Sequence, residues 1–84
     1  MICKLYTLDN QFIKQVILIP LKLTGIAEWS DGINQWFVDG KLHRLDGHAW
    51  EGSNGRKLWY VDGKQVTKEQ CELLHSVMKL KGLI

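Results

Sequence analysis

His43, Arg44 and Asp46 form the densest cluster of side chains that could do chemistry in this 84-residue chain. A histidine with a nearby carboxylate is the minimum equipment for general acid–base catalysis. No nucleophile accompanies them in the motif. In the alternative, structural interpretation, Asp46 caps the turn before Gly47, Arg44 spans that turn, and His43 donates to a backbone carbonyl. We favour this interpretation and expect no catalytic residues, hence a protein that is not an enzyme.

A metal site would combine His43 and His48 with a third ligand. The candidates for that ligand are Asp46, His75 and Cys71. Closed metal sites hold their ligands at short, characteristic spacings, and these residues show none of them. The sequence therefore predicts neither a metal ion nor another cofactor.

A glycine-rich, basic segment spans residues 52–57. Because it joins two predicted strands instead of leading into a helix, it predicts a hairpin turn and not a phosphate-binding loop. Its Arg56 and Lys57 are available to an acidic partner. Together with Lys41, Arg44 and Lys64, these two residues could form a mildly basic face that carries exposed aromatic rings, as in proteins that bind single-stranded nucleic acid. The net charge of only +2 does not favour nucleic acid as the partner.

Cys3 and Cys71 lie far apart and form no C-x-x-C pair, which argues against a disulfide scaffold. The N-terminus lacks the layout of a secretion signal. The most apolar stretch, residues 16–21, is interrupted by Pro20 and is far shorter than the roughly 20 residues of a membrane span. We expect it to be a buried strand, and we expect a cytoplasmic protein without membrane contact.

An internal repeat organises the middle of the chain. Residues 21–27 match residues 43–49 at an offset of 22, and residues 36–41 match residues 59–64 at an offset of 23. The extra residue falls in a turn, as a repeated hairpin requires, because strand register is fixed by the buried face. The turns carry Asp-Gly or Asn-Gly pairs, which tolerate positive φ, at positions 31–32, 39–40, 54–55 and 62–63.

The aromatic residues recur with the repeat. Four tryptophans occupy comparable places, so we expect aromatic pairs across adjacent strands: Trp29, Trp36, Trp50 and Trp59. Phe37 and Tyr60 each follow a tryptophan directly and must point to the opposite face, because side chains alternate along a strand. Both faces of the sheet should therefore carry aromatic surface.

The C-terminal segment, residues 67–82, predicts a helix. Thr67 and Gln70 fit a capping box, which places the helix at about residues 68–81. The inner face of this helix, which should cover one face of the sheet, consists of apolar residues at helical spacing: Cys71, Leu74, Val77 and Met78.

The N-terminal region, residues 1–19, predicts two strands, residues 2–8 and 12–19. A helix over residues 11–18 is the alternative, but β-branched residues favour the strand. Together with the repeated hairpin unit, residues 20–66, and the C-terminal helix, this gives one domain over residues 1–84. Its fold class is α+β, with a small antiparallel meander of about five or six strands and one helix packed on it.

Residues 36–49 resemble a repeat of small bacteriophage and bacterial proteins, with the pattern W-[YF]-x-[DN]-G-K-x-H-R-x-D-G-P-A. The resemblance covers about residues 19–65. His48 stands where the pattern has proline, and Leu21 and Lys22 replace His-Arg in the first copy. The resemblance implies a β-hairpin repeat and a phage or mobile-element origin. By analogy it also implies an accessory protein that binds and inhibits a host protein, for example an anti-CRISPR or other anti-defence inhibitor.

These observations favour a protein-binding module, with a nucleic-acid or nucleotide binder as the alternative. A third hypothesis is an enzyme built on His43 and Asp46. A host protein is the expected partner, and an open sheet edge with spare apolar surface favours a homodimer as well. The expected binding residues are Trp36, Phe37, His43, Arg44, Asp46, Arg56, Lys57 and Tyr60.

Overall fold

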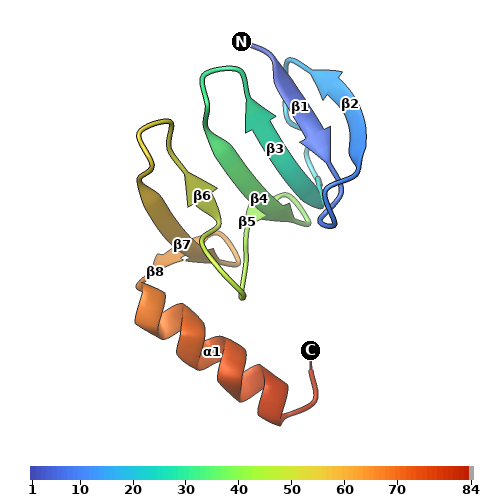
Figure 1. The fold of residues 1–84 in the computed structure, drawn as a ribbon. Helices are drawn as coiled ribbons and strands as arrows, with labels where there is room; N and C mark the ends of the chain where they lie inside the picture. Colours follow the sequence, from blue (N-terminus) through green and yellow to red (C-terminus); the bar gives the residue numbers. More distant parts are fainter. Residues whose placement is uncertain (84) are drawn as a thin grey trace.

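A computed structural model describes residues 1–83 as an antiparallel sheet of eight strands with one helix packed on it (Figure 1). The predicted α+β class is confirmed. The elements are β1 (Cys3–Tyr6), β2 (Phe12–Val16), β3 (Gly25–Trp29), β4 (Asn34–Val38), β5 (Lys41–Leu42), β6 (Trp50–Glu51), β7 (Lys57–Val61), β8 (Lys64–Val66) and α1 (Lys68–Leu80). The sheet has more strands than the expected five or six because it includes three short strands of two or three residues, β5, β6 and β8.

The spatial order of the strands is β2-β1-β3-β4-β6-β7-β8, and β5 also pairs with β4. The far edge of β4 is therefore shared, because Phe37 and Val38 pair with β5 while Asn34 and Gln35 pair with β6. Residues 43–49, which connect β5 to β6, leave the sheet between these two pairings. This loop contains most of the motif that could do chemistry.

The N-terminal region forms the hairpin β1–β2, so its second element is a strand and not the alternative helix. The expected buried strand over residues 16–21 is wrong, because β2 ends at Val16 and both Ile17 and Leu18 are exposed. Pro20 cannot donate to a strand ladder. The chain turns there instead, and the Leu23 amide donates to the Pro20 carbonyl at 3.2 Å.

The repeat appears as two copies of a three-strand unit, β3-β4-β5 and β6-β7-β8. Each copy has a tight turn of the predicted kind, with φ of 51° and 81° at Asp39 and Gly40 and of 50° and 81° at Asp62 and Gly63. Each of these turns contacts the segment of chain that precedes its own unit. The Gly40 amide donates to the Leu23 carbonyl, and the Gly63 amide donates to the Leu42 carbonyl, both at 2.8 Å.

The core lies on one face of the sheet. It contains the buried residues Cys3, Leu5, Leu23 and Ala27, against which Val16, Ile19, Trp29 and Phe37 pack. Leu23 and Ile19 come from the connection between β2 and β3, which therefore covers this face. The other face carries the alternate side chains of the same strands.

Helix α1 begins as predicted. The Thr67 hydroxyl accepts from the Gln70 amide at 3.0 Å and the Gln70 side chain accepts from the Thr67 amide at 2.9 Å, which completes the capping box. The helix ends at Leu80, and Gly82 follows with φ of 70°. Among the described residues, no helix is long and apolar enough to span a bilayer.

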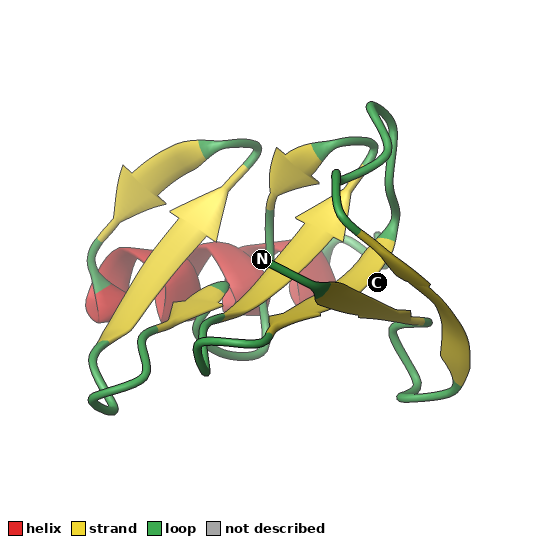
Figure 2. Cartoon of the chain, turned by 90° about the horizontal axis from the view of Figure 1, so that it is seen from above, coloured by secondary structure: helices red, strands yellow, loops and turns green. Residues whose placement is uncertain are grey.

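The inner face of α1 differs from the prediction. Thr67 alone separates β8 from the helix, so the helix runs beneath the strands (Figure 2) and packs chiefly against β7. Only Cys71 is buried, and its thiol donates to the Arg44 carbonyl at 3.3 Å. Leu74 and Val77, which the sequence assigned to the inner face, are exposed. Met78, which was also assigned to the inner face, is half-buried on the side of Cys71, and so is His75, which was not assigned to it.

Candidate functional site

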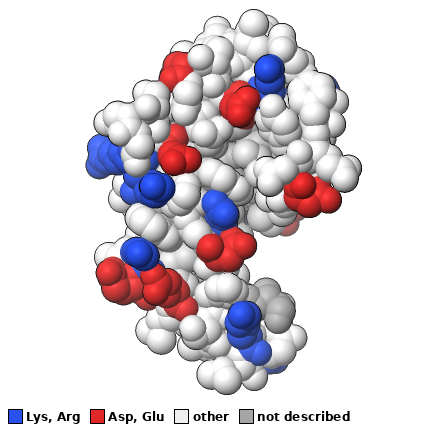
Figure 3. All heavy atoms as spheres, viewed as in Figure 1, with Lys and Arg blue, Asp and Glu red and all other residues white. Residues whose placement is uncertain are grey.

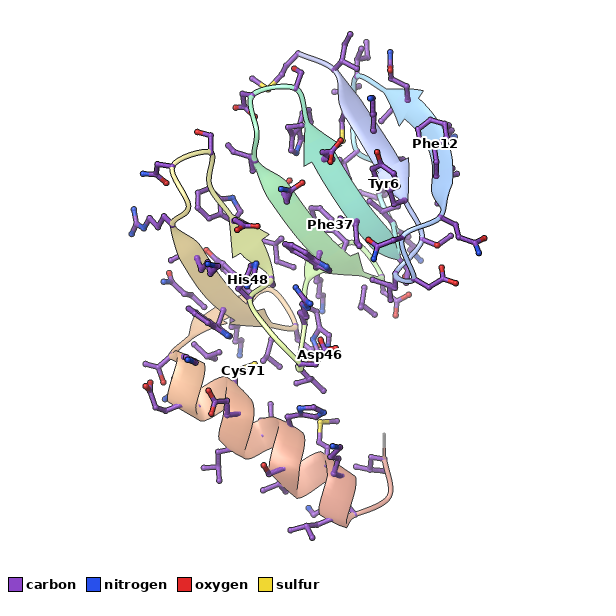
Figure 4. All side chains as sticks on the ribbon, viewed as in Figure 1. Tyr6, Phe12, Phe37, Asp46, His48 and Cys71 are labelled. Carbon is purple, nitrogen blue, oxygen red and sulfur yellow. The ribbon has the colours of Figure 1, made fainter. Side chains whose placement is uncertain are left out.

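A row of mostly aromatic side chains crosses the face of the sheet opposite the core. Strand register aligns Phe12 with Tyr6, Tyr6 with Ile26, and Ile26 with Trp36. His48 and Trp59 continue the row in the second repeat. We call these six residues the aromatic row: Phe12, Tyr6, Ile26, Trp36, His48 and Trp59. Figure 4 shows Phe12 and Tyr6 toward one end of this row and His48 toward the other.

Edge-to-face contacts join neighbouring rings toward both ends of the row. The rings of Tyr6 and Phe12 lie 5.7 Å apart, and the His48 ring lies 5.1 Å from that of Trp36 and 6.2 Å from that of Trp59. Such pairs contribute beyond the area that they bury. Histidine at position 48 therefore links the two repeats through their tryptophans.

The expected pairing of tryptophans across adjacent strands is wrong. Among residues 1–83, no two tryptophan rings contact each other. Trp36 is opposite Ile26, and Trp50 is opposite Gln35 on one side and Leu58 on the other. Equivalent tryptophans of the two repeats lie two places apart in the order of the strands, so one other strand lies between them.

Arg44 connects the row to the loop of residues 43–49. Its guanidinium carbon lies 4.5 Å from the centre of the Trp36 ring, which is a cation–π contact. Its Nε donates to Asp46 at 3.0 Å and its Nη1 donates to the His48 carbonyl at 3.1 Å. Arg44 thus spans the turn, as the structural interpretation of the motif expects.

His43 accepts a hydrogen bond where the structural interpretation expected it to donate one. Its Nδ1 accepts from the Asp62 amide at 3.0 Å and lies 3.3 Å from the Asp62 carboxylate. The first repeat uses Thr24 in the same way, because the Thr24 hydroxyl accepts from the Asp39 amide at 2.9 Å. Both side chains therefore hold a tight turn of the sheet.

Asp46 pairs with Arg44 and not with His43. The two motif residues that acid–base catalysis would combine thus have different partners. Figure 4 shows Asp46 at the tip of the loop, with Cys71 on the helix below it. In the described chain, no group of three or more histidine, cysteine or acidic residues could hold a metal ion.

A pocket of about 330 Å³ opens beside this loop. We call it the loop pocket, and its lining combines apolar and polar side chains: Leu8, Trp36, Val38, His43, Arg44, Leu45, Asp46 and His75. Four of the predicted binding residues meet here. A wider hollow of about 550 Å³ lies near Ile2 and residues 15–18, but no titratable side chain lines it.

Four residues that line the loop pocket were not among the predicted binding residues: Leu8, Val38, Leu45 and His75, of which His75 was considered only as a metal ligand. Val38 and Leu45 lie within the motif segment, residues 36–49, whereas Leu8 and His75 do not. Leu8 lies in the turn between β1 and β2, and His75 lies on α1, so neither is near the motif in sequence. The side-chain pattern around each gives no sign of a shared pocket. Only the return of the helix beneath the sheet brings His75 to the motif.

The other predicted binding residues lie elsewhere. Phe37 packs against the core on the opposite face of the sheet. Tyr60 lies on β7 and is half-buried. Arg56 and Lys57 are exposed at the turn between β6 and β7. The structure therefore gathers Trp36, His43, Arg44 and Asp46 but not these four.

The environment of His48 favours the neutral form of its imidazole. Burial lowers its pKa from the ordinary value of 6.5, an effect that Glu51 at 3.6 Å opposes and that Arg44 and Lys57 reinforce. Its Nε2 is buried without a hydrogen-bond partner among the described residues. His48 thus acts as an aromatic member of the row. Burial likewise raises the pKa of the Cys71 thiol.

No protein-family model, curated protein or solved structure matches the chain.

Proposed function

We propose that this protein is a non-catalytic protein-binding module that presents the aromatic row and the loop pocket to a partner. The observation that carries the proposal is the arrangement of Arg44 on Trp36 at the mouth of a pocket, next to a line of partly exposed rings. Binding hot spots are rich in tryptophan, tyrosine and arginine, and they cluster around pockets.

The aromatic row offers contact surface at its β2 end. Phe12 is 59% exposed, and its ring packs only edge-on against half-buried Tyr6. Helix α1 contacts chiefly β7, at the other end of the sheet. An exposed apolar surface of this kind, rimmed by polar groups, is typical of an interaction site.

Arg44 is preorganised for binding. Trp36, Asp46 and the His48 carbonyl fix its guanidinium, so a partner would not have to order a flexible side chain. Its Nη2 makes no hydrogen bond to any residue from 1 to 83 and can donate to a partner. A carboxylate or carbonyl oxygen suits this donor.

The resemblance of residues 36–49 to phage repeat proteins supports a host protein as the partner. It also supports inhibition as the consequence of binding, for example of an antiviral defence component such as a CRISPR effector. The cysteines Cys3 and Cys71 are both buried and unpaired, which supports the cytoplasm as the place of action.

Nucleic acid is the less favoured partner. Acidic and basic side chains are interspersed on the face that Figure 3 shows, with no continuous basic track. Arg44 is neutralised by Asp46, and Arg56 and Lys57 do not line the loop pocket. Nucleic-acid binding would require several cations on one surface.

Affinity capture from host-type cell lysate tests the proposal. The tagged wild-type protein is compared with Arg44→Ala and Phe12→Ser, each with and without nuclease. Leu21→Ser is the matched control, because Leu21 is 89% exposed and lies in neither the row nor the pocket. We expect a nuclease-resistant protein that the wild type and the control retain and both test variants lose.

Two results would count against the module. Capture that nuclease abolishes would assign the surface to nucleic acid. Equal loss in the Leu21→Ser control would show that the aromatic row and the loop pocket do not carry the binding. Circular dichroism of each variant establishes that the fold is retained.

A further inference from the structure

Helix α1 has two different apolar sides. Cys71, His75 and Met78 recur at intervals of four and three residues and lie toward the sheet and the loop, where Cys71 is fully buried. Leu73 and Leu80 belong to a second set, in which they are 67% and 88% exposed. In the monomer, therefore, only one of the two apolar sides of the helix packs against the rest of the protein.

The second side has the spacing of a helix–helix seam. Leu73, Val77 and Leu80 also recur at intervals of four and three residues, the pattern by which paired helices keep one stripe in contact. Leu74 flanks this stripe and is exposed as well. An isolated helix of 13 residues is marginal in water, so a partner on this side would add stability that the sheet does not supply.

We propose that this stripe is the interface of a homodimer in which two α1 helices pack antiparallel across a two-fold axis near Ser76 and Val77. The proposal does not depend on the aromatic row or on the loop pocket. It locates self-association on the helix and not on the open edges of the sheet.

The charges of the helix favour the antiparallel arrangement with a second copy. Its first two turns hold Lys68, Glu69 and Glu72, whereas its last turn and cap hold Lys79 and Lys81 without an acidic residue. Antiparallel packing places each acidic half beside the basic end of the other copy. The two helix dipoles also oppose each other in this arrangement.

The exposed area fits a weak dimer. The five apolar residues Leu73, Leu74, Val77, Leu80 and Leu83 are all exposed. They offer on the order of 300 Å² per copy, if a fully exposed leucine presents about 100 Å². Homodimer interfaces are about 65% apolar, so the total would be about 900 Å². That is close to the lower limit of about 1,000 Å² for a specific interface, so we expect association that depends on concentration.

Sedimentation equilibrium of the full chain tests this, over about 1 μM to about 1 mM, where weak complexes form. The wild type should shift from monomer to dimer with increasing concentration. Leu73→Asp and Leu80→Asp should remain monomeric with an unchanged helical signal. The control Leu21→Asp changes an equally exposed leucine outside the helix and should dimerise like the wild type.

Cysteine cross-linking tests the arrangement, because the native Cys3 and Cys71 are both buried. Ser76→Cys should form a disulfide-linked dimer on oxidation. Glu69→Cys should not, since an antiparallel pair would separate its two copies by about 20 Å, at 1.5 Å per residue.

A wild type that stays monomeric throughout the concentration range overturns the proposal. So does loss of the dimer in Leu21→Asp, which would place the interface elsewhere. Preferential cross-linking of Glu69→Cys overturns the antiparallel arrangement.

Discussion

At the scale of single residues, the two repeats provide matched positions with different surroundings. Gly40 and Gly63 both have φ of 81° in equivalent turns. A Cβ on Gly40 would lie 2.2 Å from the Leu21 carbonyl oxygen, whereas the nearest atom to one on Gly63 is 3.7 Å away. Alanine at position 63 therefore introduces backbone strain alone, whereas alanine at position 40 introduces both backbone strain and a close contact.

We predict that Gly63→Ala lowers the free energy of unfolding by about 1 kcal/mol, the cost of a left-handed conformation for a residue with a Cβ. Gly40→Ala should lose roughly twice that or more, because the Leu21 backbone must also move. Urea denaturation of both variants measures the difference. Equal losses would show that the turn of residues 39–40 does not pack against residues 21–23 as described.

His48 should make stability depend on pH. Because burial lowers its pKa in the folded chain, the unfolded chain takes up the proton more readily. The chain should therefore lose stability as the pH falls from about 6.5, the ordinary pKa of the unfolded chain, to the lower folded-state pKa, and His48 should cause no further loss below that pKa. His48→Phe should keep the aromatic contacts and flatten this dependence.

Thermal denaturation between pH 7.5 and pH 5 checks the His48 prediction against the control His75→Gln, which removes a half-buried histidine of α1. The wild type and the control should lose stability in acid more steeply than His48→Phe. An unchanged slope in His48→Phe would mean that another group causes the acid sensitivity.

At the scale of elements, helix α1 depends on its N-terminal cap. Thr67 is the whole connection between β8 and the helix, and its hydroxyl satisfies the Gln70 amide. We predict that Thr67→Ala costs about 1 kcal/mol of unfolding free energy. Thr67→Ser retains the hydroxyl and should lose much less. Urea denaturation measures both, and similar losses would exclude the cap as the cause.

Local sequence signals predicted those elements that local chemistry determines. The capping box placed the helix start, and the paired Asp-Gly turns placed the hairpins of both repeats. The lengths of the strands were harder to predict from the sequence, because β5, β6 and β8 form only where a neighbouring segment pairs with them. The end of β2 at Val16 was missed because an apolar run does not reveal where the partner strand stops, and Val16 pairs with Cys3, the first residue of β1.

The site was predictable only in part. The motif predicted that Arg44 spans the turn, but it assigned Asp46 to capping that turn, whereas Asp46 accepts from Arg44. The direction of the His43 hydrogen bond depends on a turn 19 residues away. His75 reached the loop pocket through the path of the helix beneath the sheet, which no local pattern encodes. The inner face of α1 was predicted incorrectly in part for the same reason. Leu74 and Cys71 both fit a helical repeat, and the repeat alone does not show which of them faces the sheet.

At the scale of the whole molecule, two surfaces remain for other molecules. The aromatic row with the loop pocket lies on one face of the sheet, and the leucine stripe of α1 lies on the side of the helix turned away from Cys71. Helix α1 contributes to both surfaces, but through His75 on one side and through the leucine stripe on the other. A dimer through the helices would therefore present two copies of the binding surface, which would increase its apparent affinity for a multivalent partner.

Photo-cross-linking from the aromatic row is the most direct test of the protein-binding module. A photoreactive phenylalanine analogue at position 12 is compared with the same analogue at position 21, in nuclease-treated and untreated host-type lysate. We expect that position 12 cross-links one protein in both lysates and that position 21 does not. Cross-links from position 12 to nucleic acid, or identical cross-links from both positions, would contradict this expectation.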